Sequence, residues 1–425
     1  MLDLKTQKTT LNNGVRIVSK YISHAQSVSL GVWLDSGSRD EIQSQNGISH
    51  FIEHMIFKGT QKRSALDIAR QFDAIGGHTN AFTGMETTCF HARVLCEHVP
   101  NMIDILTDIF LNATFDPLEM EKERSVIFQE IRMVEDMPEE YTLLLAEESY
   151  FKNHPLGRPI SGTIDAIATF QPQDLKNYFK TAYQPHRIVI AAAGNIDHSH
   201  LVDLLSPAFE GLESSFTEQK RTVPLPYKDL QIHIKPVEQT NLCLLAPGLS
   251  VTHKNRFALY LLNCLLGGNM SSRLFQQIRE DRGLAYTIES FTGAFSDTGT
   301  IMVYAGVDAK NAFLTSQLIF AEMDRLQHHC VSSDELINAK EFARGNMLLA
   351  TESIDNQMVR AAQNEIQMNR YIPVEETLAS IMAVTPEDIQ KLAQQLLSPQ
   401  DCAITLLCPK GAHVKEIKKL KEALQ

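Results

Sequence analysis

The amino-acid sequence predicts an α+β fold made of two homologous halves, each with an antiparallel sheet packed against helices. Two observations lead to this prediction. Short apolar segments typical of strands occur in groups, and long amphipathic segments follow the groups instead of alternating with single strands. The second half of the 425-residue chain also repeats a pattern of the first half. A chain of this length has room for more than one domain with its own core.

Three identities at one offset, about half the chain length, carry the repeat. They are the pairs Pro172 and Pro386, Asp174 and Asp388, and Pro185 and Pro399. Each copy predicts a helix that begins at the first proline, stops before the last, and leads into an apolar strand, at 188–193 and 403–407. We therefore expect domains at 1–212 and 230–425, each able to fold alone, joined by a polar linker at 213–229.

The remaining elements of the first half follow from local periodicity. Alternating or continuous apolar residues predict strands at 15–18 and 28–34 and a strand pair around 81–95. Amphipathic periodicity predicts helices at 64–75, 100–112, 117–150 and 172–182.

Composition excludes several classes of protein. The net charge of −12 argues against nucleic acid as a partner. No apolar run approaches the roughly 18–20 residues of a membrane helix, and residues 1–15 resemble neither a signal nor a transit peptide. Seven scattered cysteines without a CxxC pair are typical of reduced thiols in a cytosol-like compartment.

The segment His50-Phe51-Ile52-Glu53-His54 is the clearest chemical motif. Two histidines four residues apart lie on one face of a helix and can share one Zn²⁺, while Glu53 on the same face can act as a general base. Asn46-Gly47 is a suitable helix start. The alternative is a core helix with two hydrogen-bonded histidines.

A third metal ligand is expected from a separate helix downstream. Asp116 predicts a helix start, and the following apolar seam includes Met120, Ile127 and Val134. Glu123 and Glu130 fall on this seam, where a carboxylate is costly unless it is paired or binds a metal. Arg124 is predicted to point outward. The pattern alone does not choose between Glu123 and Glu130, and buried arginines could also pair with them.

Several segments in order along the chain resemble one known family. They include Gly-Ile-Ser-His-Phe-Ile-Glu-His-Met-Ile-Phe-Lys-Gly-Thr at 47–60, Gly-Gly-His-Thr-Asn-Ala-Phe-Thr at 76–83 and Glu-Arg-Ser-Val-Ile-Phe-Gln-Glu-Ile at 123–131. Shorter matches lie at 13–16, 37–41, 154–158 and 267–274. The chain thus resembles the insulinase/pitrilysin family of zinc peptidases, and within it the branch of mitochondrial processing peptidase and its bacterial relatives.

The resemblance implies a role for each residue of the motif. His50, His54 and Glu130 would bind one Zn²⁺ per chain, Glu53 would be the general base, and Glu123 would orient a ligand. It also implies two homologous halves that enclose a peptide chamber like a clam shell.

Substrate contacts are expected from both halves. Asn80, Ala81, Phe82 and Thr83 enter a strand whose edge could bind an extended peptide. Arg282 and Tyr286 resemble the Arg/Tyr pair that active members place over the zinc site. The alternative for the pair is a turn with a surface arginine and a core tyrosine.

The sequence therefore predicts a zinc endopeptidase that cleaves extended or unfolded peptides. Because one chain carries both the zinc motif and the Arg/Tyr pair, it resembles the self-sufficient bacterial homodimers, with a cytoplasmic location. In a eukaryote the mitochondrial matrix would be the alternative, with the presequence already removed. The competing hypothesis is a non-catalytic peptide-binding or scaffold subunit of the same family, which would be expected to lack the metal motif.

Overall fold

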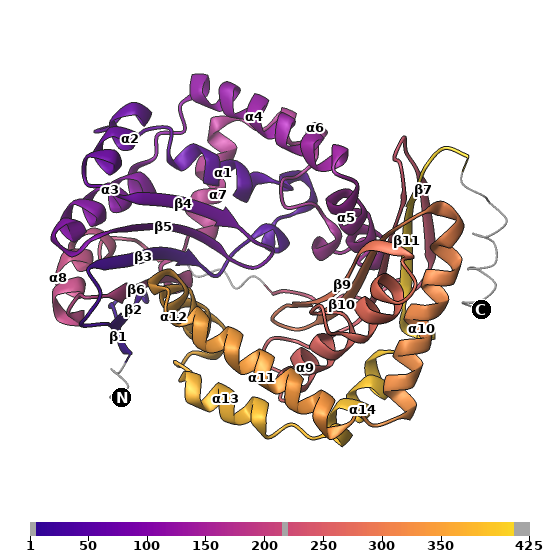
Figure 1. Cartoon of the computed structure of the whole chain (residues 1–425). Helices are drawn as coiled ribbons and strands as arrows, with labels where there is room; N and C mark the ends of the chain where they lie inside the picture. Colours follow the sequence, from indigo (N-terminus) through magenta and orange to yellow (C-terminus); the bar gives the residue numbers. More distant parts are fainter. Residues whose placement is uncertain (1–5, 215–219, 412–425) are drawn as a thin grey trace. The chain divides into compact units, whose positions relative to one another are not determined.

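The structure is a computed structural model, and it describes residues 6–214 and 220–411. Contacts divide the chain into two compact units, each assembled from three stretches of sequence (Figure 1). Unit 1 takes in Met1–Ile131, Arg158–Arg221 and Leu348–Ile372. Unit 2 takes in Arg132–Gly157, Thr222–Met347 and Pro373–Gln425.

The first half of the chain contributes six strands and eight helices among its described residues. The strands are β1 (Gln7–Thr10), β2 (Arg16–Tyr21), β3 (Ser27–Leu34), β4 (His78–Thr83), β5 (Thr88–Leu95) and β6 (Ile188–Gly194). The helices are α1 (Ile48–Ile56), α2 (Ala65–Ala74), α3 (Val99–Asn112), α4 (Pro117–Asp136), α5 (Pro138–Tyr150), α6 (Ile164–Thr169), α7 (Pro172–Ala182) and α8 (His198–Phe209).

The second half contributes five strands, six α-helices and a π-helical turn at Phe275–Glu280, again counting described residues. The strands are β7 (Leu230–Ile234), β8 (Thr240–Pro247), β9 (Ala285–Ala294), β10 (Gly299–Val307) and β11 (Ala403–Cys408). The helices are α9 (Arg256–Leu266), α10 (Ala312–His328), α11 (Ser333–Ala350), α12 (Ile354–Met368), α13 (Val374–Met382) and α14 (Pro386–Leu396).

The two sheets have the same strand order apart from the added edge strand β1, which confirms the predicted homologous α+β halves. The sheet of unit 1 runs β1-β2-β6-β3-β5-β4, and that of unit 2 runs β7-β11-β8-β10-β9. In unit 1 the strand β6 lies between β2 and β3, and in unit 2 the strand β11 lies between β7 and β8. The last strand of each half therefore takes the same place in its sheet. Pro172 begins α7 and Pro386 begins α14, as the repeat predicted.

The prediction of an antiparallel sheet in each half needs a correction for one strand pair in each sheet. β6 runs parallel to β2 and antiparallel to β3, and β11 runs parallel to β7 and antiparallel to β8. The reason is topological. A strand inserted between two neighbours that run in opposite directions must be parallel to one of them.

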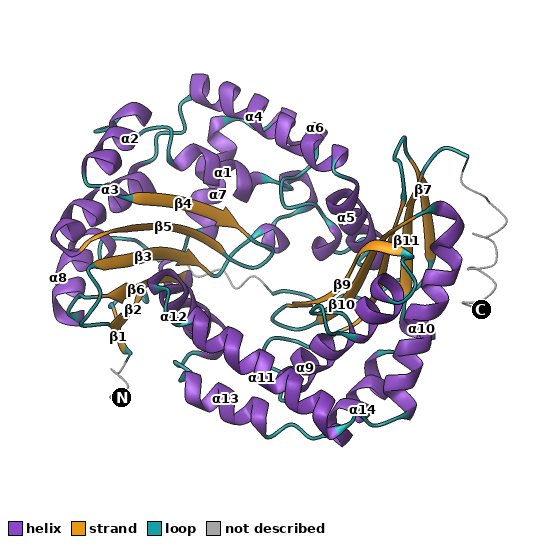
Figure 2. Ribbon diagram, in the orientation of Figure 1, coloured by secondary structure: helices purple, strands orange, loops and turns teal. Residues whose placement is uncertain are grey.

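Each sheet packs against helices, and two helices are exchanged between the halves of the sequence. In unit 1, helices such as α1, α3 and α8 pack on one face of the sheet, and α12 from the second half packs across β6, β3 and β2 on the other (Figure 2). In unit 2, α9, α10 and α14 share a core with their sheet, while α5 from the first half packs across β8 and β11. The compact units thus differ from the segments 1–212 and 230–425.

Contacts from α12 bury one face of the first sheet. The Trp33 indole Nε1 donates a hydrogen bond to Met358 Sδ at 3.2 Å, and both side chains are buried. Arg93 of β5 forms an ion pair with Asp355 at 2.8 Å. The second half of the sequence therefore completes the core of unit 1.

Two further predictions change. The helix expected at 117–150 is two helices, α4 and α5, because Pro138 at the start of α5 has no N–H to continue α4. Arg124 is buried instead of outward, and it donates to the carbonyl oxygens of Ile167 and Phe170.

Some expectations fall partly outside the described residues. Residues 215–219 of the expected linker and 412–425 of the expected second domain are among these. In the described part of the linker, Arg221 forms ion pairs with Asp35 and Asp40 of unit 1. No helix among the described residues is long and apolar enough to span a membrane.

Candidate metal centre

Helix α1 is fixed at its N-terminus by a buried carboxylate. Glu41 accepts hydrogen bonds from the backbone N–H groups of Gly47 at 2.7 Å and Ser49 at 2.9 Å. These N–H groups have no partner within the helix, so Glu41 takes the place of a capping side chain. Gly47 has a φ of +93°, and a Cβ there would lie 2.8 Å from the Cα of Gly162. Asn46-Gly47 therefore begins the helix as predicted.

One face of α1 packs in the core, and the opposite face carries the side chains of the motif. Ile48, Phe51, Ile52 and Met55 are buried in the core of unit 1, as the sequence predicted. His50, Glu53 and His54 point away from this core toward α4 and β4, where they contact Glu130, Thr83 and Glu123. The apolar face thus sets the rotation of the helix and presents its histidines on the opposite side.

Helix α4 brings in the carboxylates. Asp116 caps its start by accepting from the N–H groups of Leu118 and Glu119, as predicted. Met120 and Ile127 are buried, so the seam of the helix faces the core. Glu123 and Glu130 lie two turns apart beside this seam, with side chains 8% and 36% exposed.

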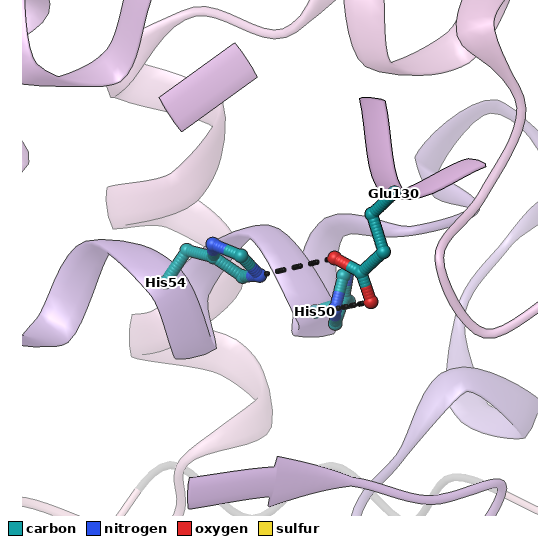
Figure 3. A group of neighbouring side chains, drawn as sticks. All are labelled: His50, His54 and Glu130. Atoms are coloured by element: carbon teal, nitrogen blue, oxygen red, sulfur yellow. Dashed lines mark ion pairs between the residues drawn. The ribbon is translucent and has the colours of Figure 1, made fainter. Parts of the chain in front are cut away.

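His50, His54 and Glu130 converge on one point (Figure 3). The Nε2 atom of His50 lies 3.5 Å from Oε1 of Glu130, and Nε2 of His54 lies 3.5 Å from Oε2. Ligands about 2.0–2.1 Å from a tetrahedral Zn²⁺ would be roughly 3.3–3.4 Å apart. One ligand atom from each of the three residues lies within 4.8 Å of the other two, so these residues form a donor set that suits a zinc ion with a fourth position open.

The electrostatics of this group also suit a cation. Hydrogen bonding to His50 and His54 holds the pKa of Glu130 well below its ordinary value. Burial lowers the pKa of His54, but its contacts with Glu130 and Glu123 outweigh burial and raise it. The carboxylates thus favour positive charge at this point, whether a proton or a metal ion supplies it.

Glu123 makes a different contact. Its Oε2 lies 3.0 Å from Nδ1 of His54, and its Oε1 lies 2.6 Å from Nζ of Lys58. A carboxylate that accepts the Nδ1 proton leaves the Nε2 lone pair of His54 for a metal. Glu130 therefore faces the Nε2 atoms of both histidines, while Glu123 binds the Nδ1 side of the His54 ring.

Within the expected substrate strand, the structure separates the four residues by face. Ala81 packs against the main core of unit 1, and Thr83 on the same side of β4 donates a 2.6 Å hydrogen bond to Glu53. Phe82 is on the other side, with its ring centroid 5.3 Å from that of Trp33. The side-chain oxygen of Asn80 accepts from the N–H of Ala81. Among the strands that the structure describes, β4 is the last of its sheet and pairs with β5 alone.

Comparison with protein families decides the classification. Residues 16–164 match the model described as insulinase (peptidase family M16), and residues 169–342 match the model described as peptidase M16 inactive domain. The chain belongs to the insulinase family, M16. His50, His54 and Glu130 all lie in the first of the two matched regions.

Bacterial proteins named as zinc proteases match almost the whole chain. A protein named an uncharacterized zinc protease of Bacillus subtilis is 40% identical over 95% of this chain and 98% of its own length. A similarly named zinc protease of Streptomyces coelicolor is 36% identical over 92% of this chain and 87% of its own.

Two solved structures share the fold. A protease from Helicobacter pylori has a TM-score of 0.90 at 20% identity, with 95% of this chain and 99% of that chain covered. A peptidase M16 inactive domain from Pseudomonas fluorescens also has a TM-score of 0.90, at 19% identity, with 96% and 100% covered. At these identities the likeness concerns the fold alone.

Arg282 and Tyr286, the pair that resembles the M16 Arg/Tyr motif, belong to unit 2. They follow the π-helical turn, and Arg282 donates to the carbonyl oxygen of Gln277. Tyr286 is 77% exposed, so the alternative of a core tyrosine is wrong. The Arg279 guanidinium lies 5.2 Å from the centre of the Tyr286 ring and 4.8 Å from that of Phe275.

Sequence reasoning missed three residues around the candidate metal centre, namely Glu41, Lys58, and Thr83 as a partner of Glu53. In unit 2 it also missed Arg279, which lies beside the Tyr286 ring. Lys58 could have been found, because it lies four residues after His54, just past the end of the same helix. The partners of Glu41 and Thr83 depend on how separate elements pack, and local spacing carries no signal for them.

Proposed function

We propose that this protein is a zinc-dependent endopeptidase that hydrolyses extended or unfolded peptides. One Zn²⁺ per chain would be held by His50, His54 and Glu130. The observation that carries the proposal is that Glu130 of α4 lies 3.5 Å from the Nε2 atoms of both His50 and His54. These two histidines share one face of α1 with Glu53. Glu123 would orient His54 without binding the metal.

The chemistry divides between the metal and the protein. When bound, Zn²⁺ supplies Lewis acidity toward a water and the scissile carbonyl. Glu53 lies one turn from His50 on the same helix face, and it takes a proton from the attacking water. Glu53 then passes this proton to the leaving amine, so its carboxylate is restored at the end of the cycle.

Substrate binding is proposed at the free edge of β4. Within residues 80–82, the backbone N–H and C=O groups that point away from β5 can donate to and accept from an extended peptide, largely without regard to its sequence. Arg282 and Tyr286 would add contacts to the substrate carbonyl and the developing oxyanion. Tyr286 supports this role by its exposure, since its hydroxyl is not buried in the core.

From the resemblance of the sequence to the self-sufficient bacterial homodimers, we also propose a cytoplasmic homodimer as the working form. Sedimentation of the purified protein tests the dimer. The match of residues 169–342 to the inactive-domain model favours the competing role, a non-catalytic subunit. The group of three candidate ligands in the first half favours the catalytic role instead.

The decisive experiment separates metal ligands from the base. His50→Ala and Glu130→Gln should both lose stoichiometric zinc and peptidase activity on a quenched peptide library. Glu53→Gln should keep its zinc and lose activity, because it removes a base and not a ligand. Cleavage by Glu53→Gln at the wild-type rate would refute the proposed mechanism.

Glu123→Gln gives the complementary test of the ligand assignment. We expect zinc affinity to fall by roughly 10–100-fold, as for other residues that orient a ligand. Competition with a chelator measures this affinity. The assignment is reversed if Glu123→Gln loses zinc while Glu130→Gln retains it.

A further inference from the structure

The hydroxyl of Thr83 is committed to the candidate base. Its Oγ1 donates to Oε2 of Glu53 at 2.6 Å, which is short and favourable for an O–H donor to a carboxylate. Among the residues that the structure describes, none hydrogen-bonds Oε1 of Glu53. One carboxylate oxygen is therefore held in place, and the other is left for a proton.

The backbone of Thr83 is held firmly at the end of β4. Thr83 pairs with Thr88 of β5, and the turn between them closes with a 2.7 Å hydrogen bond from Gly84 N–H to the carbonyl of Thr87. The hydroxyl of Thr88 donates to the carbonyl of Ser36 at 3.0 Å. The donor to Glu53 therefore sits on a fixed point of the sheet.

One short segment, residues 37–41, hydrogen-bonds both elements that carry the Thr83–Glu53 contact. The N–H groups of Ser38 and Arg39 donate to the carbonyls of Gly84 and Met85 in the β4–β5 turn. A Cβ at Gly37 would collide with the carbonyl oxygen of Gly84, so glycine allows this close approach.

The other end of segment 37–41 holds the helix of the base. Glu41 accepts from the N–H groups of Gly47 and Ser49 at the start of α1. The strand that carries Thr83 and the helix that carries Glu53 are thus bound to the same five residues. This fixes the separation between the hydroxyl and the carboxylate.

We propose that Thr83 is a positioning residue that holds Glu53 in its proton-accepting orientation, and that it is not a side-chain contact to the substrate. The inference rests on the proposed function, since it concerns the base of that reaction. A misplacement of about 1 Å in a catalytic group can lower the rate by roughly 10²-fold. Loss of the hydroxyl should therefore act on turnover and leave peptide binding nearly unchanged.

The test compares Thr83→Val, Thr83→Ala and Thr83→Ser in the full-length protein. Valine keeps the shape and removes the donor, alanine removes both without adding bulk, and serine restores the donor. We expect kcat to fall by roughly 10–100-fold in the valine and alanine variants, with KM within about threefold and zinc content unchanged. Serine should recover most of the turnover.

A second readout does not depend on activity. In crystal structures of the zinc-depleted proteins, the Glu53 carboxylate should hold one orientation in the wild type and in Thr83→Ser, and more than one in Thr83→Val. Wild-type kcat in both donor-less variants, or a rise in KM alone, would overturn the inference. Glu53→Gln serves as the control for the reaction itself. If Glu53→Gln is active, the proposed function fails; if it is inactive while Thr83→Val turns over normally, the role of Thr83 alone fails.

Discussion

The Nζ atom of Lys58 lies 2.6 Å from Oε1 of Glu123, whose other oxygen lies 3.0 Å from Nδ1 of His54. Both oxygens of this buried carboxylate are therefore engaged. Lys58 thereby helps to keep Glu123 behind His54 and leaves Glu130 to face the two Nε2 atoms. The contact places an ammonium group and a candidate cation site on either side of one carboxylate–histidine pair.

Lys58→Met should destabilise the zinc-depleted protein by about 1–2 kcal/mol. A fully buried pair that loses one partner costs roughly 3–5 kcal/mol, but Lys58 is 30% exposed, so water reduces the effect. The loss should be smaller with zinc bound, because the bound cation also stabilises the Glu123 carboxylate through His54. Denaturant unfolding with and without a chelator measures both values. Lys58→Arg, which keeps the charge, is the control; an equal loss in the two conditions would contradict the argument.

Tyr286→Phe should bind zinc normally and lower kcat by about 10²–10³-fold, the usual loss when an oxyanion donor is removed. KM should change little, because the contact is proposed for the transition state. Steady-state kinetics and metal analysis check the two parts. Unchanged turnover would assign Tyr286 to another role on the exposed surface.

Residues 1–212 expressed alone should not reach the folded state, contrary to what the sequence repeat predicts. Without α12, the side chains of Trp33, Val189 and Ala191 would lose the cover that Met358 and Ala362 provide. Trp33 is the one tryptophan of the chain, so its emission reports this face directly. We expect the emission of an exposed indole, and a shift toward the buried form when 230–425 is added. A cooperative melt of 1–212 with buried-type emission would mean that α5 takes the place of α12.

Met358→Ala in the intact chain is the milder form of the same change. It should lower the free energy of unfolding by about 2–4 kcal/mol, as for other buried Met→Ala substitutions. Denaturant unfolding followed by Trp33 emission measures the loss, and an unchanged midpoint would show that Met358 contributes little to this face.

Glu41 should make stability depend on pH. Burial raises the pKa of Glu41 to about 7, and the N–H bonds from Ser49 and Gly47 offset part of this effect. The folded protein then binds the Glu41 proton more tightly than the unfolded chain, so the contribution of Glu41 to stability falls as pH rises through about 7. The difference in free energy of unfolding between wild type and Glu41→Gln should shrink by about 2–3 kcal/mol between pH 5 and pH 8, as measured by denaturant unfolding at each pH. A constant or growing advantage would show that the N–H bonds outweigh burial.

Much of the fold and the site was predictable because the signals are local. The apolar side of α1, the cap at Asp116 and the strands β3 and β6 follow from spacing along a few residues. His50, Glu53 and His54 share one helix, so their common face is fixed by helical geometry alone. The repeated Pro-Asp pattern was enough to predict two homologous halves, and the matching sheet orders confirm it.

What only the tertiary structure decided involves partners from distant parts of the chain. Glu123 and Glu130 fit the helical spacing of α4 equally well. The packing of α4 beside α1 determines that Glu130, and not Glu123, faces the Nε2 atoms of both histidines. The exchange of α5 and α12, the burial of Arg124 and the contact between Thr83 and Glu53 likewise depend on which surfaces meet in space. Sequence periodicity determines which face of an element is apolar, whereas the neighbour of that face is set by the packing of the whole chain.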